Sequence, residues 1–227
     1  FMIPKTTKLG KYSVTYLCKE EYKIISNEIF SKQIYKINLS PSSPHIFDIG
    51  SHIGLSILYF KKIYPNSIIQ AFEPNPNVYP ILQENIEQNR LKNVKIHNIA
   101  LGQKNTKRTF YIDSSGTCAF STASFKKNAW NGKQQTLPIL VNTEKLSDYI
   151  NHNIDLLKMD IEGAEKEVLE DLRINKKMKY VKNIIFEYHP DKKHKIGKII
   201  TKFLSDYKIK TTNMGEGLIL ILGQKRP

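Results

Sequence analysis

The chain is short of cysteine and of long apolar runs. Cys18 and Cys118 are the only cysteines among 227 residues, so the sequence holds neither a disulfide framework nor the thiol spacing of a metal site. This usage is typical of a reducing compartment, and we expect a cytoplasmic protein. No apolar stretch approaches the roughly 20 residues that a membrane-spanning helix needs. The longest, Leu218–Leu222, predicts a buried strand.

Arginine is also scarce, although the chain is strongly basic. The net charge is +14, yet arginine occurs only at Arg90, Arg108, Arg173 and Arg226, so nearly all the positive charge is lysine. Guanidinium is the preferred group for bidentate contacts with phosphates and bases, so this composition argues against a specific nucleic-acid site. An RNA substrate stays as an alternative, which a steep salt dependence would reveal.

The length and the 40% share of apolar residues fit a single α/β domain with a substantial core. Residues 1–44 form a leader, in which Glu20–Phe30 has the apolar spacing of an amphipathic helix. We expect this leader to act as a lid region on the domain edge. A proline-containing linker at 41–44 then enters the main domain, residues 45–227.

From His45 onward, short apolar strands alternate with helical patterns, which predicts a mostly parallel seven-stranded sheet closed by a C-terminal antiparallel hairpin. The expected strands are 45–49, 68–72, 94–101, 156–159, 181–186, 208–212 and 218–222. The expected helices are 53–63, 78–89, 164–172 and 194–207. The alternation breaks in between, where we expect a short strand at 109–112, a long functional loop at 113–124 and a helix from a Thr143 cap to Ile150.

The turn after the first strand is the clearest functional signal. Asp48 lies near the end of that strand, and Gly50 and Gly54 stand four positions apart in the turn that follows. In open α/β sheets, ligands bind outside the carboxyl ends of the strands. A dinucleotide site needs a third glycine for close approach to a pyrophosphate. The two-glycine turn instead favours a cofactor with an adenosine and an amino-acid tail but no phosphates, such as S-adenosylmethionine.

Each part of that cofactor has an expected partner. Backbone N–H groups of the turn and of the N-terminus of the following helix suit the carboxylate of the tail. Glu73, at the end of the second strand, can accept hydrogen bonds from both ribose hydroxyls. Backbone groups at the end of the third strand border the adenine. The expected cofactor-binding residues are Asp48, Gly50, Ser51, His52, Gly54, Glu73, Pro74, Ala100 and Leu101.

Acids and a histidine follow two further strands, at Asp160, Glu187 and His189. If the cofactor gives its methyl group to an alcohol, the acceptor must be aligned and a base must lie within hydrogen-bond reach. Asp160 is the first candidate for that base and His189 the second, with Glu187 able to orient either. The same three side chains could instead bind Mg²⁺ that acidifies the hydroxyl. Ordinary alternatives are an Asp160 helix cap and a His189 in a surface loop.

Four segments together resemble the FkbM-type methyltransferases: Phe47–Gly50, Ala71–Pro76, Ala100–Gly102 and Leu157–Glu165. The resemblance covers residues 45–190. It implies a class I methyltransferase (Rossmann-like) fold, S-adenosylmethionine as donor, and O-methylation of a sugar or natural-product hydroxyl. We expect the acceptor to be a sugar, a glycan or a glycosylated small molecule. His52 departs from the pattern, where Asn or Thr is commoner. A cofactor-fold module that binds a partner without catalysis is the non-enzymatic alternative, and the intact glycines and acids argue against it.

Overall fold

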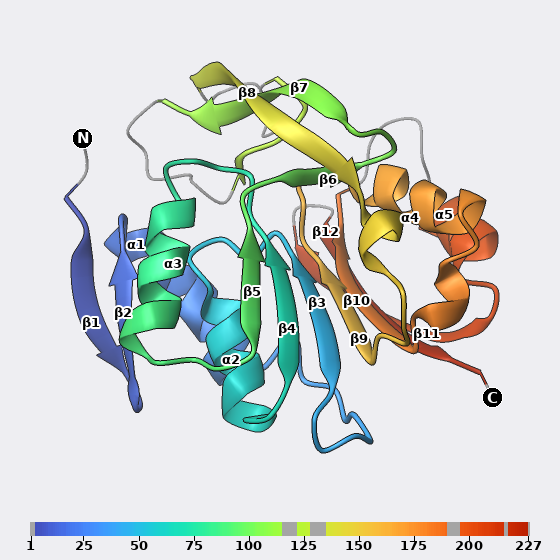
Figure 1. The fold of residues 1–227 in the computed structure, drawn as a ribbon, viewed down its shortest axis with the longest axis horizontal. Helices are drawn as coiled ribbons and strands as arrows, with labels where there is room; N and C mark the ends of the chain where they lie inside the picture. Colours follow the sequence, from blue (N-terminus) through green and yellow to red (C-terminus); the bar gives the residue numbers. More distant parts are fainter. Residues whose placement is uncertain (1–2, 115–121, 128–134, 190–195, 216–217, 227) are drawn as a thin grey trace.

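The computed structural model shows a protein built on a seven-stranded sheet (Figure 1). The structure describes residues 3–114, 122–127, 135–189, 196–215 and 218–226. The spatial strand order is β11–β12–β10–β9–β3–β4–β5, with parallel pairs from β10 to β5 and β12 antiparallel to both of its neighbours. The predicted α/β fold is therefore confirmed. The strands are β3 (His45–Ile49), β4 (Ile68–Phe72), β5 (Val94–His97), β9 (Leu156–Met159), β10 (Asn183–Tyr188), β11 (Tyr207–Gly215) and β12 (Leu218–Lys225).

Alternating side chains along the central strands build a separate core on each face of the sheet. In β3, Ile46 packs into one core, whereas Phe47 and Ile49 pack into the other. The core of Ile46 is covered by helices α2 (Leu55–Ile63) and α3 (Tyr79–Gln88), and the opposite core by α4 (Glu165–Ile174) and α5 (Ile196–Phe203). Among the helices in the described residues, none has the length and apolar character to span a bilayer.

The N-terminal segment begins with a hairpin that the sequence analysis did not predict. Strands β1 (Lys5–Leu9) and β2 (Tyr12–Tyr16) pair antiparallel, and Thr15 exchanges hydrogen bonds with the Asn85 side chain of α3, at 2.7 and 2.8 Å. The predicted helix at 20–30 is present in two parts, α1 (Lys19–Ser26) and the π-helix η1 (Asn27–Ser31).

A second, three-stranded sheet lies across the carboxyl ends of the main strands (Figure 1). Its strands are β6 (Ala100–Gly102), β7 (Thr106–Asp113) and β8 (Thr136–Lys145). The predicted strand 94–101 is confirmed only for residues 94–97, which form β5, because the chain then leaves the main sheet and pairs as β6 with β8. The predicted helix from Thr143 is wrong, because Thr143 pairs with Ala100 and Thr106 inside β8.

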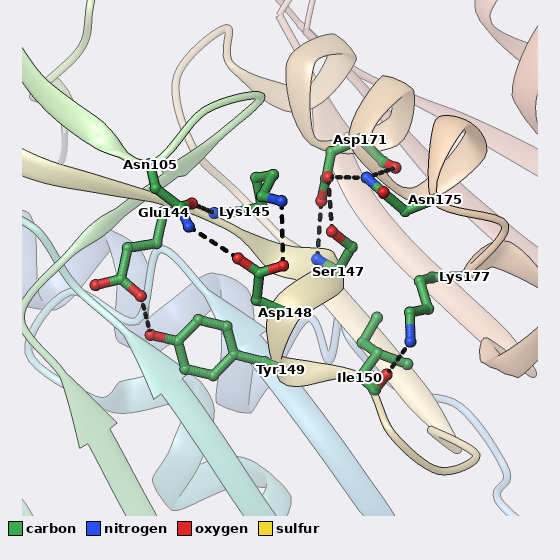
Figure 2. Close-up of polar contacts among 10 residues, drawn as sticks. All are labelled: Asn105, Glu144, Lys145, Ser147, Asp148, Tyr149, Ile150, Asp171, Asn175 and Lys177. Atoms are coloured by element: carbon green, nitrogen blue, oxygen red, sulfur yellow. Dashed lines mark hydrogen bonds and ion pairs between the residues drawn. The ribbon is translucent and has the colours of Figure 1, made fainter.

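The short 3-10 helix after β8, η3 (Leu146–Tyr149), is tied to α4 by side chains (Figure 2). Asp171 of α4 accepts hydrogen bonds from the backbone N–H and the hydroxyl of Ser147, both at 2.8 Å. The Lys177 Nζ donates to the carbonyl of Ile150 at 2.7 Å. These bonds fix the path of the chain from the second sheet into β9, whose carboxyl end carries Asp160.

Candidate active site

A single cavity at the carboxyl ends of the strands brings together most of the predicted site residues. Its wall has three sources: the strand ends of the main sheet, the N-terminal segment and the second sheet. Asp48 and Gly54, two predicted cofactor residues, are not part of the wall. The predicted residues that line it are Gly50, Ser51, His52, Glu73, Pro74, Ala100, Leu101, Asp160, Glu187 and His189.

Gly50 is required by the close approach of two strands. Its φ is +76°, and a Cβ atom built there would lie 1.8 Å from the backbone carbonyl oxygen of Asp160. The N–H groups of Gly50 and Ser51 donate to the carbonyl of Phe72 at 3.0 and 3.1 Å, and that of His52 donates to Glu73 at 2.9 Å. Those three donors are therefore engaged within the protein. They close the turn against β4, so the expected carboxylate role is left to the N-terminus of α2, where it stays a prediction.

Glu73 is a nearly buried carboxylate, 6% exposed, at the end of β4. Its Oε2 accepts the His52 N–H at 2.9 Å and its Oε1 accepts the Asn75 N–H at 2.8 Å. Burial raises the pKa of Glu73 to about 7, even though the two backbone hydrogen bonds oppose the shift. Each carboxylate oxygen has a second acceptor position, so Glu73 can still receive donors from a ligand in the cavity.

Asp48 lies behind the cavity wall in an ion pair with Lys158. The Oδ1 of Asp48 and the Nζ of Lys158 are 3.1 Å apart, and Ser56 donates to the Oδ2 at 2.6 Å. Lys158 also donates to the carbonyl of Gly50 at 2.7 Å. Burial lowers the pKa of Lys158, but the charges of Asp48 and Asp160 more than compensate and raise it. Sequence reasoning missed Lys158, although a lysine inside the apolar strand β9 was a visible signal.

Glu187 is held by the N-terminal segment. The hydroxyl of Tyr35 donates to Glu187 Oε1 at 2.8 Å, and the Lys158 Nζ lies 5.4 Å from the centre of the Tyr35 ring. Burial raises the pKa of Glu187 to about 7 and the pKa of Tyr35 well above its usual value. Tyr35 was not predicted, because it lies in a segment without a recognisable motif.

His189 sits between two glutamates that the sequence analysis did not assign. Its Nε2 is 3.2 Å from Glu162 and its Nδ1 is 2.9 Å from Glu165. Burial by itself lowers the pKa of His189, but the hydrogen bond to Glu165 and the charges of Glu162, Glu165 and Asp160 raise it to about 10. His189 therefore holds a proton at neutral pH. It is not the surface-loop residue of the ordinary alternative.

The loop that carries Glu162 is itself constrained. Glu162 has a left-handed φ of +54°, which is uncommon outside glycine and clusters at functional sites. Ser124, from the predicted loop 113–124, donates to the Glu162 carbonyl at 2.8 Å; residues 115–121 of that loop lie outside the described residues. Burial raises the pKa of Glu162 to about 8. Helix α4 begins only at Glu165, with Ala164 as its cap, so Asp160 is not a helix cap.

The predicted magnesium set of Asp160, Glu187 and His189 overlaps in part with the residues that the described structure brings together. Asp160, Glu162 and His189 each offer one possible ligand atom, and these atoms lie within 4.8 Å of one another. The fourth residue, Glu187, accepts the Tyr35 hydroxyl, and without a metal His189 is protonated and offers no lone pair, so magnesium binding stays a prediction. The imidazolium supplies the positive charge that these clustered carboxylates require.

The strand order, with β12 antiparallel between β10 and β11, and the acids at the strand ends define a class I methyltransferase fold. The Methyltransferase FkbM domain matches residues 48–210. The chain belongs to the FkbM methyltransferase family.

Individual relatives agree with that assignment. Methyltransferase 1 of Beauveria bassiana (strain ARSEF 2860) is 33% identical over 171 residues, which are 68% of each chain. The 2-O-methyltransferase NoeI of Sinorhizobium fredii (strain NBRC 101917 / NGR234) is 26% identical over 145 residues, 58% of each chain. The crystal structure of methyltransferase FkbM from Methylobacillus flagellatus KT superposes with a TM-score of 0.59 and 16% identity. That match covers 91% of this chain and about half (51%) of the other, and it shows the fold.

Proposed function

We propose that this methyltransferase transfers the methyl group of S-adenosylmethionine to a hydroxyl group of a sugar, glycan or glycosylated small molecule. The observation that carries the proposal is Glu73, a nearly buried carboxylate that lines the same cavity as Asp160. Membership of the FkbM family supports methyl transfer, and a relative whose name states 2-O-methylation supports an oxygen acceptor.

The donor occupies the part of the cavity next to β3, β4 and β6. Glu73 accepts the two ribose hydroxyls, for which its oxygens have acceptor positions left. Ala100 and Leu101 border the adenine, and the Gly50–Gly54 turn borders the amino-acid tail. Asp48 acts from behind the wall, because its ion pair with Lys158 holds the carbonyl of Gly50 in place.

The chemistry requires an aligned acceptor and a place for one proton. The acceptor oxygen attacks the methyl carbon, the carbon–sulfur bond breaks, and the hydroxyl proton passes to the carboxylate of Asp160. Positioning such a base is worth roughly 10²–10⁴-fold in rate. His189 is protonated at neutral pH, so its role is to hold Glu162 and Glu165 rather than to take the proton. Glu187, fixed by Tyr35, orients the same end of the cavity.

The leader acts as the lid region of this enzyme. The cavity wall includes Glu28 of η1 and Tyr35 beyond it, and the Glu21 carboxylate of α1 is 3.5 Å from the His52 ring of the cofactor turn. A segment that contacts the cofactor turn and Glu187 is placed to cover bound substrates.

The donor half of the proposal is tested by calorimetry with S-adenosylhomocysteine and wild-type protein. We expect saturable binding with one site per chain. The acceptor half is tested by incubating the protein with S-adenosylmethionine labelled in the methyl group and fractionated cell extract. The label should appear in a hydroxylated small molecule. Absence of S-adenosylhomocysteine binding by folded protein would refute the donor assignment, and label in RNA would refute the acceptor assignment.

A further inference from the structure

An exposed isoleucine stands at the cavity wall. Ile24 of α1 is 61% exposed and lines the cavity, whereas the other large apolar side chains with high exposure in the described residues do not. Tyr22 and Ile25 of α1 are partly buried and pack against the core on the α2 side, whereas Ile24 of the same helix is left exposed. The exposed side chain of Ile24 is therefore apolar surface in the cavity wall that the protein's own core does not cover.

The isoleucines that line the cavity beside Ile24 pack against the protein core. Ile25 and Ile34 are partly buried and Ile29 is buried, and all three belong to the core on the α2 side of the sheet. Ile29 and Glu28 lie in the π-helix η1, an irregularity that is frequent at functional sites. An apolar ligand group would thus meet a preformed surface that costs little to order.

This wall is distinct from the one expected for the adenine of the donor. The apolar residues next to the proposed adenine position, Phe72, Ile99 and Leu101, belong to the core on the α4 side. The N-terminal isoleucines belong to the opposite core, so they lie apart from the adenine position and offer an apolar surface to the second substrate.

We infer that Ile24, Ile25, Ile29 and Ile34 form a subsite, the N-terminal wall, for an apolar group on the methyl acceptor. The acceptor is then a hydroxyl compound with a lipophilic part rather than a purely polar sugar. The inference rests on the proposed function only in taking the second occupant of the cavity to be the acceptor. Glu28, in the same wall, offers a carboxylate to a hydroxyl of that compound.

A membrane surface is the alternative partner for an exposed apolar side chain on a helix. Helices that bind anionic membranes are rich in basic residues on the polar face. The charged residues of α1 are two lysines and two glutamates, so the helix carries no net charge. That balance favours a small lipophilic acceptor.

A series of alkyl β-glucosides tests the inference, because its members share one sugar and differ in chain length. Binding of the methyl, butyl, hexyl and octyl compounds is measured by calorimetry below micelle-forming concentrations, with the protein saturated with S-adenosylhomocysteine. We expect affinity to rise with chain length, by up to about fourfold for each buried methylene. In the Ile24→Asp variant, glucoside affinity should no longer rise with chain length, while the affinity for S-adenosylhomocysteine stays unchanged.

Ile174→Asp is the matched control, because Ile174 is 59% exposed at the end of α4 and lies outside the cavity wall. In this variant, glucoside affinity should rise with chain length as it does in wild type. Equal affinity for all four glucosides, or no binding of any of them, would overturn the inference. An equal effect of Ile174→Asp on the series would also overturn it. The same holds if wild-type protein, but not Ile24→Asp, binds phosphatidylcholine vesicles in a sedimentation assay. Loss of S-adenosylhomocysteine binding would instead count against the proposed function.

Discussion

Asp48 and Lys158 face each other on adjacent parallel strands and form an ion pair, 3.1 Å long, that is almost completely withdrawn from water. Their side chains are 0% and 2% exposed. Taking two charges out of water is costly, so such a pair is stable only when both partners and their hydrogen bonds are present. The pair joins β3 to β9, and through Gly50 it reaches the cavity wall.

Lys158→Met should destabilise the fold, because it leaves the Asp48 carboxylate buried without its cation. The expected loss is about 3–5 kcal/mol in the free energy of unfolding, measured by urea titration. The double variant with Asp48→Asn no longer buries an unpaired carboxylate, so it should recover part of the lost free energy of unfolding. A single variant as stable as wild type would show that the pair does not support the fold.

Glu73→Ala should weaken binding of S-adenosylhomocysteine by about 10- to 100-fold, the scale of hydrogen bonds to a charged acceptor. The measurement is calorimetry on variants whose thermal melts show a folded protein. Glu87→Ala, which alters an exposed glutamate of α3, should bind like wild type. Unchanged affinity in the Glu73 variant would remove this residue from the donor site.

Asp160→Asn separates a chemical role from a structural one. The carboxylate is not a helix cap, since α4 begins at Glu165, so no capping interaction is lost. If Asp160 accepts the hydroxyl proton, turnover should fall roughly 10²–10⁴-fold. S-adenosylhomocysteine affinity and melting temperature should change little. Near-normal turnover would exclude Asp160 as the base.

His189 predicts a loss of stability at alkaline pH. Its pKa in the folded protein, about 10, lies above the usual 6.5, so the folded state binds the proton more tightly. The resulting stabilisation is fully present below about pH 6.5 and is lost as the pH rises toward 10. Thermal melts across this range should show a steeper decline for wild type than for His189→Asn. Parallel curves would mean that His189 carries no proton in the folded protein at neutral pH.

The lysine-rich surface should bind nucleic acid only weakly and without sequence preference. We expect dissociation constants for tRNA or duplex DNA of about 10⁻⁴–10⁻⁶ M at physiological salt. Fluorescence anisotropy at several salt concentrations measures them. A nanomolar, sequence-selective complex would favour the RNA methyltransferase alternative over a small-molecule acceptor.

The main sheet could be predicted from the sequence because local signals mark each of its parts. The period of the apolar residues distinguishes strands from helices, and Pro65 and the glycines after Ile49 mark where they end. Strand ends in a parallel sheet also share one edge, which is why Glu73 and Asp160 could be placed in one cavity from the chain alone.

The second sheet and the partners of the catalytic candidates could not be predicted in this way. Ala100 follows an apolar strand without an obvious break, and its pairing with Thr143 depends on a strand some forty positions away. The bond between Tyr35 and Glu187 likewise joins residues that no local pattern relates. Such choices are made by tertiary packing, which periodicity does not record.

The contact at Gly50 has a consequence for redesign of this enzyme. The Asp160 carbonyl occupies the place where a side chain at position 50 would begin. The distance between the cofactor turn and the end of β9 therefore cannot accommodate a larger residue there. Substitutions that aim to change the acceptor are therefore better placed in α1 and η1. A library that varied the turn itself would lose folded protein before it gained specificity.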